Sequence, residues 1–288
     1  MQSGNHQNGG VSREATPVGR RRSPWPLAVV AALFIIVPFI FWYGTWFGRP
    51  LKDEEIDEYL MDETKPRHMQ HALAQLAERI ARGDESARRW HPQISRVASS
   101  DVADVRMTAA WVMGEEHASE DFRHALLRLL EDPEPIVRRN AALALVRFGD
   151  ARCRPELRAM LQPFIVVGRT EGTTLAALTE GNFVKRDAML ARVKKTDSSI
   201  EEVRSPLPGR ISRALVKESE QVQVGRELFQ LAPDADSVWE SLRALYLIGT
   251  AEELAEVERY AQGVEGMPER VRQQATLTAE AIKRRGPQ

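Results

Sequence analysis

The sequence predicts a mainly α-helical protein, an α-solenoid with an inserted β-sandwich and one N-terminal transmembrane helix. Three observations lead to this fold class. Residues 27–47 form a continuous apolar run. From Pro66 onward, apolar residues recur at helical spacing in short segments separated by Gly, Asp or Pro. Between Gln162 and Asp234 this spacing gives way to short β-branched segments punctuated by Gly and Pro.

The composition excludes several classes of protein. The 288 residues include 40 Lys and Arg against 41 Asp and Glu, and 43% of them are hydrophobic. A chain with this apolar content is not disordered throughout. A formal net charge of −1 provides no basic field to attract nucleic acid. Cys153 is the single cysteine, so it forms neither an internal disulfide nor a thiolate metal site.

Residues 25–48 are predicted to be a transmembrane helix, preceded by a disordered tail at 1–24. No charged residue lies between Arg22 and Arg49, and a helix needs about 20 apolar residues to cross a bilayer. The alternatives are a buried helix of a soluble protein and a cleavable signal peptide. Against them, the run is apolar on every face and ends in aromatic residues rather than in a cleavage site.

The charges that flank this segment predict its orientation. Four arginines precede it, whereas the nearest residues after it hold only Arg49 and Lys52 as basic residues. Because the cytoplasmic side retains Lys and Arg during insertion, we expect a cytoplasmic N-terminus. Residues 49–288 are then expected outside the inner membrane, in the periplasm where the cell has one.

Residues 49–65 are predicted to form an acidic amphipathic helix that packs against the first repeat. Ile56, Tyr59 and Leu60 fall on one helical face, with carboxylates around them. An acidic docking site for a basic partner is the alternative interpretation.

Residues 66–162 are predicted to be stacked helical repeats. The segment from Val105 to Gly114 matches the segment that begins at Val137, 32 positions later. The paired small residues in each match allow neighbouring helices to approach closely. Gly114 and Gly149 are expected to end their helices in left-handed caps.

The helical pattern resumes over residues 235–288. Residues 238–249 repeat the helix that ends at Gly149, and two further helical segments follow, over 251–260 and from Pro268 onward. The strand-rich stretch therefore divides one repeat between its two helices, and we expect it to protrude from the solenoid.

This pattern of Asp, then Val-Arg, then Ala-Ala, then an aliphatic residue and Gly resembles the HEAT repeat family. The resemblance implies a scaffold for protein–protein interaction. The arginines of the pattern are Arg106, Arg138 and Arg272. We expect them to tie adjacent repeats together through loop aspartates, and ligand contact is the alternative.

Residues 163–234 contain two similar halves. The segment that begins at Gly172 aligns with the one that begins at Gly209, and Val184 and Leu190 keep the spacing of Val222 and Leu228. A two-fold β-sandwich explains this duplication, because each half offers one apolar face that the other half covers.

Around these positions the stretch resembles the biotinyl/lipoyl carrier domain, also called a barrel-sandwich hybrid, in particular at Ser205-Pro206-Leu207-Pro208-Gly209. The resemblance implies that the residue eight positions before Pro206, at a hairpin tip, corresponds to the modified lysine. That residue is Ser198. A hydroxyl cannot form the amide that attaches the cofactor, so the prediction is an unmodified module without cofactor. Lys194 and Lys195 are the alternative acceptors.

The sequence offers no catalytic motif. It has no Gly-x-Ser-x-Gly, no phosphate-binding Gly-rich loop and no Cys-His pair in a recognisable context. His68 and His71 share one helical face and could hold a metal, but no third ligand follows them at a suitable spacing. We expect no catalytic residue, no cofactor and no metal, and hence no enzyme.

The expected function is therefore a single-pass, membrane-anchored scaffold or adaptor. Its partners are the lipid bilayer and one or more proteins, in a bacterial envelope complex for transport or secretion, and not nucleic acid. The alternative is a lipoyl or biotinyl carrier that is modified on Lys194 or Lys195.

Overall fold

A computed structural model describes residues 25–42 and 50–286, and the chain divides into two compact units, Met1–Pro50 and Leu51–Gln288. In the first unit, α1 (Trp25–Trp42) is an 18-residue helix with Pro38 inside it. Its exposed side chains include Phe34, Ile35 and Phe39. No helix within the described residues meets the length and hydropathy that a bilayer crossing requires. The rest of the predicted span and the tail lie outside the described residues, so the membrane crossing stays a prediction.

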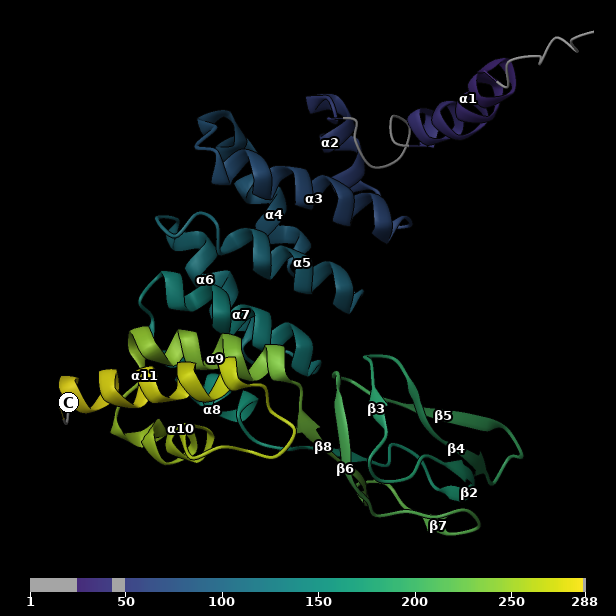
Figure 1. Ribbon diagram of the computed structural model, residues 1–288, viewed down its shortest axis with the longest axis vertical. Coiled ribbons are helices and arrows are strands. Elements are labelled where there is room, and N and C mark those ends of the chain that lie inside the picture. The colour runs from purple at the N-terminus through teal and green to yellow at the C-terminus, as the bar shows by residue number, and fades with distance from the viewer. Residues whose placement is uncertain (1–24, 43–49, 287–288) are drawn as a thin grey trace, which may run out of the picture. The chain divides into compact units, whose positions relative to one another are not determined.

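The second unit contains ten α-helices among its described residues, and Figure 1 shows them stacked in succession. They are α2 (Asp53–Met61), α3 (Pro66–Ala81), α4 (His91–Val97), α5 (Ala103–Met113), α6 (Glu120–Leu129), α7 (Pro135–Arg147), α8 (Arg154–Met160), α9 (Ala235–Ile248), α10 (Leu254–Ala261) and α11 (Glu269–Arg285). Short 3-10 helices precede α4, α8 and α10, over Glu85–Trp90, Ala151–Cys153 and Ala251–Glu253.

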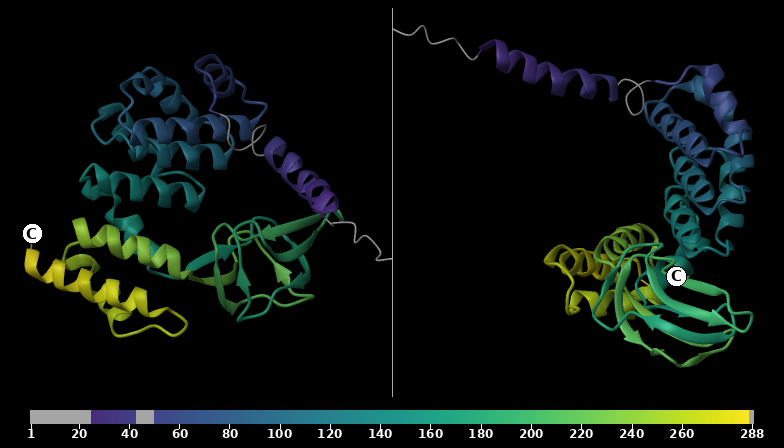
Figure 2. Two further views of the ribbon diagram at one scale, coloured as in Figure 1. Left: turned by 45° about the horizontal axis from the view of Figure 1, so that its top comes forward. Right: turned by 90° about the vertical axis from the view of Figure 1, so that its right-hand side faces the viewer.

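These helices form two layers (Figures 1 and 2). The longer helices α3, α5, α7, α9 and α11 pack side by side in one layer. The shorter helices α2, α4, α6, α8 and α10 form the other, and each packs against the long helix that follows it. One apolar core runs between the layers and includes Trp90, Phe122, Leu145, Leu242 and Tyr260. This arrangement is an α-solenoid.

Local signals in the sequence set several helix ends. The Ser119 hydroxyl accepts a hydrogen bond from the Phe122 amide at the start of α6, and Asp234 caps α9 by accepting bonds from the amides of residues 236 and 237. Gly149 lies in the left-handed region, with φ 67°, as expected after α7.

The same expectation for Gly114 is wrong. Its φ is −66°, in the right-handed region. A Cβ built on Gly114 would lie 2.9 Å from the Cβ of Ala144 on α7. The glycine is therefore needed for the close approach of α5 and α7, and not for a left-handed turn.

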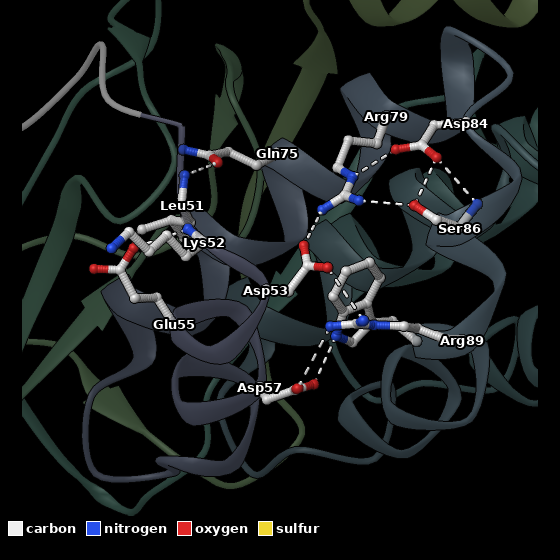
Figure 3. A network of polar contacts seen from close by, with 11 residues as sticks. Leu51, Lys52, Asp53, Glu55, Asp57, Gln75, Arg79, Asp84, Ser86 and Arg89 are labelled. Atoms are coloured by element: carbon white, nitrogen blue, oxygen red, sulfur yellow. Dashed lines mark hydrogen bonds and ion pairs between the residues drawn. The ribbon is translucent and has the colours of Figure 1, made fainter.

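Helix α2 packs on the first repeat, with Ile56 and Leu60 fully buried. A polar network reinforces this contact (Figure 3). The Arg79 guanidinium lies 2.8 Å from Asp53 and 2.8 Å from Asp84, and the indole Nε1 of Trp90 donates to Asp57 at 2.7 Å. The carboxylates of Asp53 and Asp57 thus serve this packing, which disfavours the interpretation of α2 as a docking site for a basic partner.

The strands lie between α8 and α9, which pack against each other. The buried Ser241 hydroxyl of α9 donates to the carbonyl oxygen of Leu157 on α8 at 2.6 Å. The Tyr260 hydroxyl of α10 donates to the carbonyl oxygen of Leu161 at 2.8 Å. The repeat is therefore completed across the insertion.

Eight strands form two antiparallel sheets that enclose a second apolar core. They are β1 (Phe164–Val167), β2 (Gly172–Ala177), β3 (Phe183–Val184), β4 (Met189–Lys195), β5 (Ile200–Arg204), β6 (Gly209–Ala214), β7 (Gln221–Val222) and β8 (Glu227–Pro233). The orders are β1-β8-β6-β3 and β5-β4-β2-β7. Inward residues such as Leu190, Ile211 and Phe229 come from both sheets, so the element is a β-sandwich.

The two sheets are related by a pseudo-two-fold axis, as the sequence duplication predicts. Exchanging β1 for β5, β8 for β4, β6 for β2 and β3 for β7 converts one strand order into the other. The registers agree, because Gly172 pairs with Val222 where Gly209 pairs with Val184. Both glycines are required for the same reason, since a Cβ at either would collide with a carbonyl oxygen of the neighbouring strand, at Lys194 and Ala232 respectively.

Candidate functional site

Of the three predicted arginine ties, Arg106 makes one through a loop aspartate, and Arg138 makes one through a glutamate of the next helix instead. Arg106 on α5 holds the buried Asp132 with two bonds, from Nε at 2.6 Å and from Nη2 at 2.9 Å. Arg138 on α7 donates to the Asp132 carbonyl oxygen at 2.7 Å and lies 3.2 Å from the Glu156 carboxylate on α8. Arg272 differs, because it is exposed and pairs with Glu269 within α11. Arg106 and Arg138 are thus engaged in holding the solenoid together.

Ser198 lies at the tip of the β4–β5 hairpin. Its φ is 67°, and its amide donates to the Lys195 carbonyl oxygen at 3.0 Å, which closes the turn. Lys194 is exposed, and the Lys195 ammonium lies 3.7 Å from the Glu201 carboxylate. The structure therefore brings Ser198, Lys194 and Lys195 to one hairpin, beside a polar hollow of about 590 Å³.

His68 and His71 lie one helical turn apart on α3, and both make contacts with their own chain. The His68 ring stacks on Tyr59 with centroids 4.4 Å apart. The His71 Nε2 lies 3.1 Å from the Gln75 side-chain amide. In the part of the chain that the structure describes, no three His, Cys, Asp or Glu side chains form a group that could hold a metal ion.

The most distinctive surface of the solenoid is a groove of about 670 Å³ across its long-helix layer. The described parts of the solenoid expose five large apolar side chains, at Met61, Trp111, Tyr246, Leu247 and Leu277. All except Met61 line this groove. Exposed apolar residues are normally scattered singly over a protein surface, so a cluster of them is typical of an interaction site.

Small residues form the floor of the groove. Ala144 and Ala244 come from α7 and α9, Gly114 directly follows α5, and all three are buried. Around this floor stand Trp111, 47% exposed, and Leu247, 62% exposed. The groove is therefore a shallow apolar channel, open to solvent, that crosses four neighbouring helices from α5 to α11.

Charged side chains border the groove. Arg147 pairs with Glu115 at 2.6 Å, so these two charges compensate each other. Arg243 stacks over the Trp239 ring at 4.6 Å, and within the described residues neither Arg243 nor Arg284 has an ion pair within 4 Å. The pKa of Glu240 is raised, first by desolvation in the groove wall and then by Asp234 and Asp236.

This groove was not predicted from the sequence. A signal for it exists, because Trp111 and Leu143 occupy the same position in the two matched repeats, immediately before a buried residue on the inner face. Two large apolar residues at an outward position of neighbouring repeats indicate a surface for a partner. Leu247 and Leu277 fall in the later, less regular repeats, where this comparison is weaker.

Comparison with known proteins supports the repeat assignment. A model of the HEAT repeat family matches residues 92–164, from the start of α4 to the first strand. HEAT repeats suggest a scaffold for protein–protein interaction, and proteins of that family are generally non-enzymatic. No curated protein matches the chain.

Proposed function

We propose that this protein is a non-enzymatic scaffold or adaptor that binds a protein partner in the groove between α5 and α11. The observation that carries the proposal is the concentration of exposed apolar side chains on this face of the solenoid. Burying a leucine side chain contributes roughly 1.5–3 kcal/mol, so Leu247 and Leu277 together with Trp111 would dominate the binding.

We further propose that α1 anchors the scaffold in a membrane. The support is the uncharged apolar sequence between Arg22 and Arg49 and the helix over Trp25–Trp42 within it. The arginines before this segment favour a cytoplasmic N-terminus, with the repeats outside the inner membrane of a bacterial envelope. A partner in an envelope transport or secretion complex suits this location.

The β-sandwich serves this scaffold as an unmodified lipoyl-like module. The two-fold strand order and the hairpin that carries Ser198 support the resemblance to carrier domains. A serine at the tip supports an assembly role without an attached group.

Partner recovery from native membranes tests the binding function. We expect the double variant Leu247→Ser/Leu277→Ser to lose the partner that co-purifies with the unaltered protein after crosslinking. Met61→Ser is the matched control, because Met61 is equally exposed on α2, away from the groove. Equal recovery with all three proteins would contradict the proposal.

Two measurements test the anchor. The protein should stay in the membrane fraction after extraction at high pH. A reporter enzyme that folds only outside the cytoplasm should be active when it is fused after Gln288. A reporter that is active only in the cytoplasm should be inactive at the same position. Cys153 is unsuited to a labelling assay of topology, because it is fully buried and burial raises its pKa to about 12.

A carrier function is the second candidate, and the exposed Lys194 beside the hairpin tip is the observation that favours it. The intact mass of protein purified from its own host separates the two functions. An added lipoyl or biotinyl mass that disappears in Lys194→Arg or Lys195→Arg would establish the carrier. The scaffold proposal expects the unmodified mass.

A further inference from the structure

We infer that the occupant of the groove is an amphipathic α-helix of a partner protein, with carboxylates beside its apolar ridge. This inference rests on the proposed function and specifies its partner. Three features of the groove support it. Its floor consists of small residues, its side-chain amides donate hydrogen bonds to their own helices, and two arginines at its border have no ion pair within 4 Å among the described residues.

The floor suits the ridge of a helix. Gly114, Ala144 and Ala244 carry no side chain beyond Cβ, so a helix lying over them can approach to the spacing of packed helices. The groove crosses four neighbouring helices, and adjacent helices lie about 9 Å apart, which gives a length of about 27 Å. A helix of about 18 residues spans this distance.

The polar side chains of the groove disfavour an extended peptide. An extended peptide needs partners for its own amides and carbonyls, whereas a helix satisfies these groups internally. Asn140 and Gln274 are the side-chain amides in the lining. The Asn140 amide donates to the Ile136 carbonyl oxygen at 2.9 Å, and the Gln274 amide donates to the Thr278 hydroxyl at 3.3 Å. Both amides thus donate to their own helices.

The charges at the border of the groove favour a partner with carboxylates. The Arg147–Glu115 pair is internally neutral, and among the described residues neither Arg243 nor Arg284 has a carboxylate within 4 Å, although Arg243 acts on Glu240 over a longer distance. Glu240 is the other acidic residue of the lining, so the unpaired charge of the groove is positive by one. A partner helix with Asp or Glu beside its apolar ridge complements this charge, whereas a basic helix would be repelled.

Photo-crosslinking in the host membranes tests the inference with the full chain. A photoreactive amino acid replaces Leu247, and mass spectrometry identifies the crosslinked segment of the partner. We expect apolar residues spaced three and four positions apart, flanked by Asp or Glu. Arg284→Glu should lower the crosslinking yield about threefold, and Arg128→Glu, an exposed change on α6, should leave the yield unchanged.

The outcomes separate the inference from the proposed function. A crosslinked segment that is basic, or that lacks helical spacing, overturns the inference and leaves protein binding in place, and so does an unchanged yield with Arg284→Glu. A crosslink to lipid or to a second copy of this chain overturns the inference as well. The proposed function is overturned if the photoreactive group at position 247 gives no more crosslinking than the same group placed at Met61. Thermal unfolding of each variant confirms that it is folded.

Discussion

The solenoid and the β-sandwich are both built by duplication, but they differ in what their repeated positions do. In the sandwich, equivalent residues have the same structural role, since Gly172 and Gly209 each allow a neighbouring strand to approach closely. In the solenoid, the inward positions are equivalent while the outward ones change from repeat to repeat. Trp111 and Leu143 share one outward position, and the following repeat has Arg243 there. The groove that we propose as the binding surface therefore draws its individual character from the outward positions, where the repeats differ.

The largest expected effect comes from breaking a tie between repeats. In Asp132→Ala, Arg106 loses both of its carboxylate bonds while it remains mostly buried. We expect a loss of about 3 kcal/mol in the free energy of unfolding, because a buried charge is left unpaired. Tryptophan fluorescence during denaturation measures this loss without a signal from the β-sandwich, since residues 163–234 contain no tryptophan. Glu269→Ala, which removes the exposed partner of Arg272, should cost under about 0.5 kcal/mol.

The next effect tests the symmetry of the sandwich. Gly172→Ala and Gly209→Ala each introduce a Cβ that collides with a backbone oxygen. We expect both to cost about 2 kcal/mol, and the two losses to be similar because the sites are equivalent. Hydrogen exchange of the strand amides measures the loss. A large loss at one glycine and none at the other would show that the two halves are not equivalent.

A smaller effect concerns acid stability in the solenoid. The His91 ring packs against the Phe122 ring at a tilt of 43°, with the centroids 4.5 Å apart, and burial lowers the pKa of His91 from the ordinary 6.5. The imidazole of the unfolded chain therefore binds a proton more readily than that of the folded chain. The contribution of His91 to the free energy of unfolding is fully present above pH 6.5 and is lost as the pH falls toward the pKa of the folded state. His91→Phe should reduce the drop in unfolding free energy between pH 7.5 and pH 5.5. An unchanged drop would assign the acid sensitivity to other groups.

The smallest effect on stability belongs to the outward positions. Leu247→Ser and Leu277→Ser should each change the unfolding free energy by less than about 0.5 kcal/mol, because both side chains are more than half exposed. Leu245→Ser, two residues away on the same helix, should cost several times more, since Leu245 is fully buried. Chemical denaturation compares the three. A large loss of unfolding free energy with Leu247→Ser would mean that Leu247 stabilises the fold and is not reserved for a partner.

The sequence predicts much of this architecture because duplication and periodicity are local signals. The alignment of Val184 with Val222 predicts the two-fold symmetry of the sandwich, and the Val-Arg pattern predicts the tie that Arg106 makes with Asp132. Gly114 was misassigned because its role depends on Ala144, which lies 30 positions away in the chain. The groove was missed for a related reason, since its residues come from four helices and meet only in three dimensions.

The contact between α8 and α9 has a consequence for how such a chain can change. Since the Ser241 hydroxyl bonds to α8 and the Tyr260 hydroxyl bonds to Leu161, the residue that follows α8, the stack of helices is continuous in space although it is interrupted in sequence. We therefore expect that the intervening strands can be shortened, exchanged or replaced by a short linker while the helical stack keeps its form, with the loss of the Arg186–Asp104 and Arg169–Glu134 ion pairs that join the sandwich to the helices.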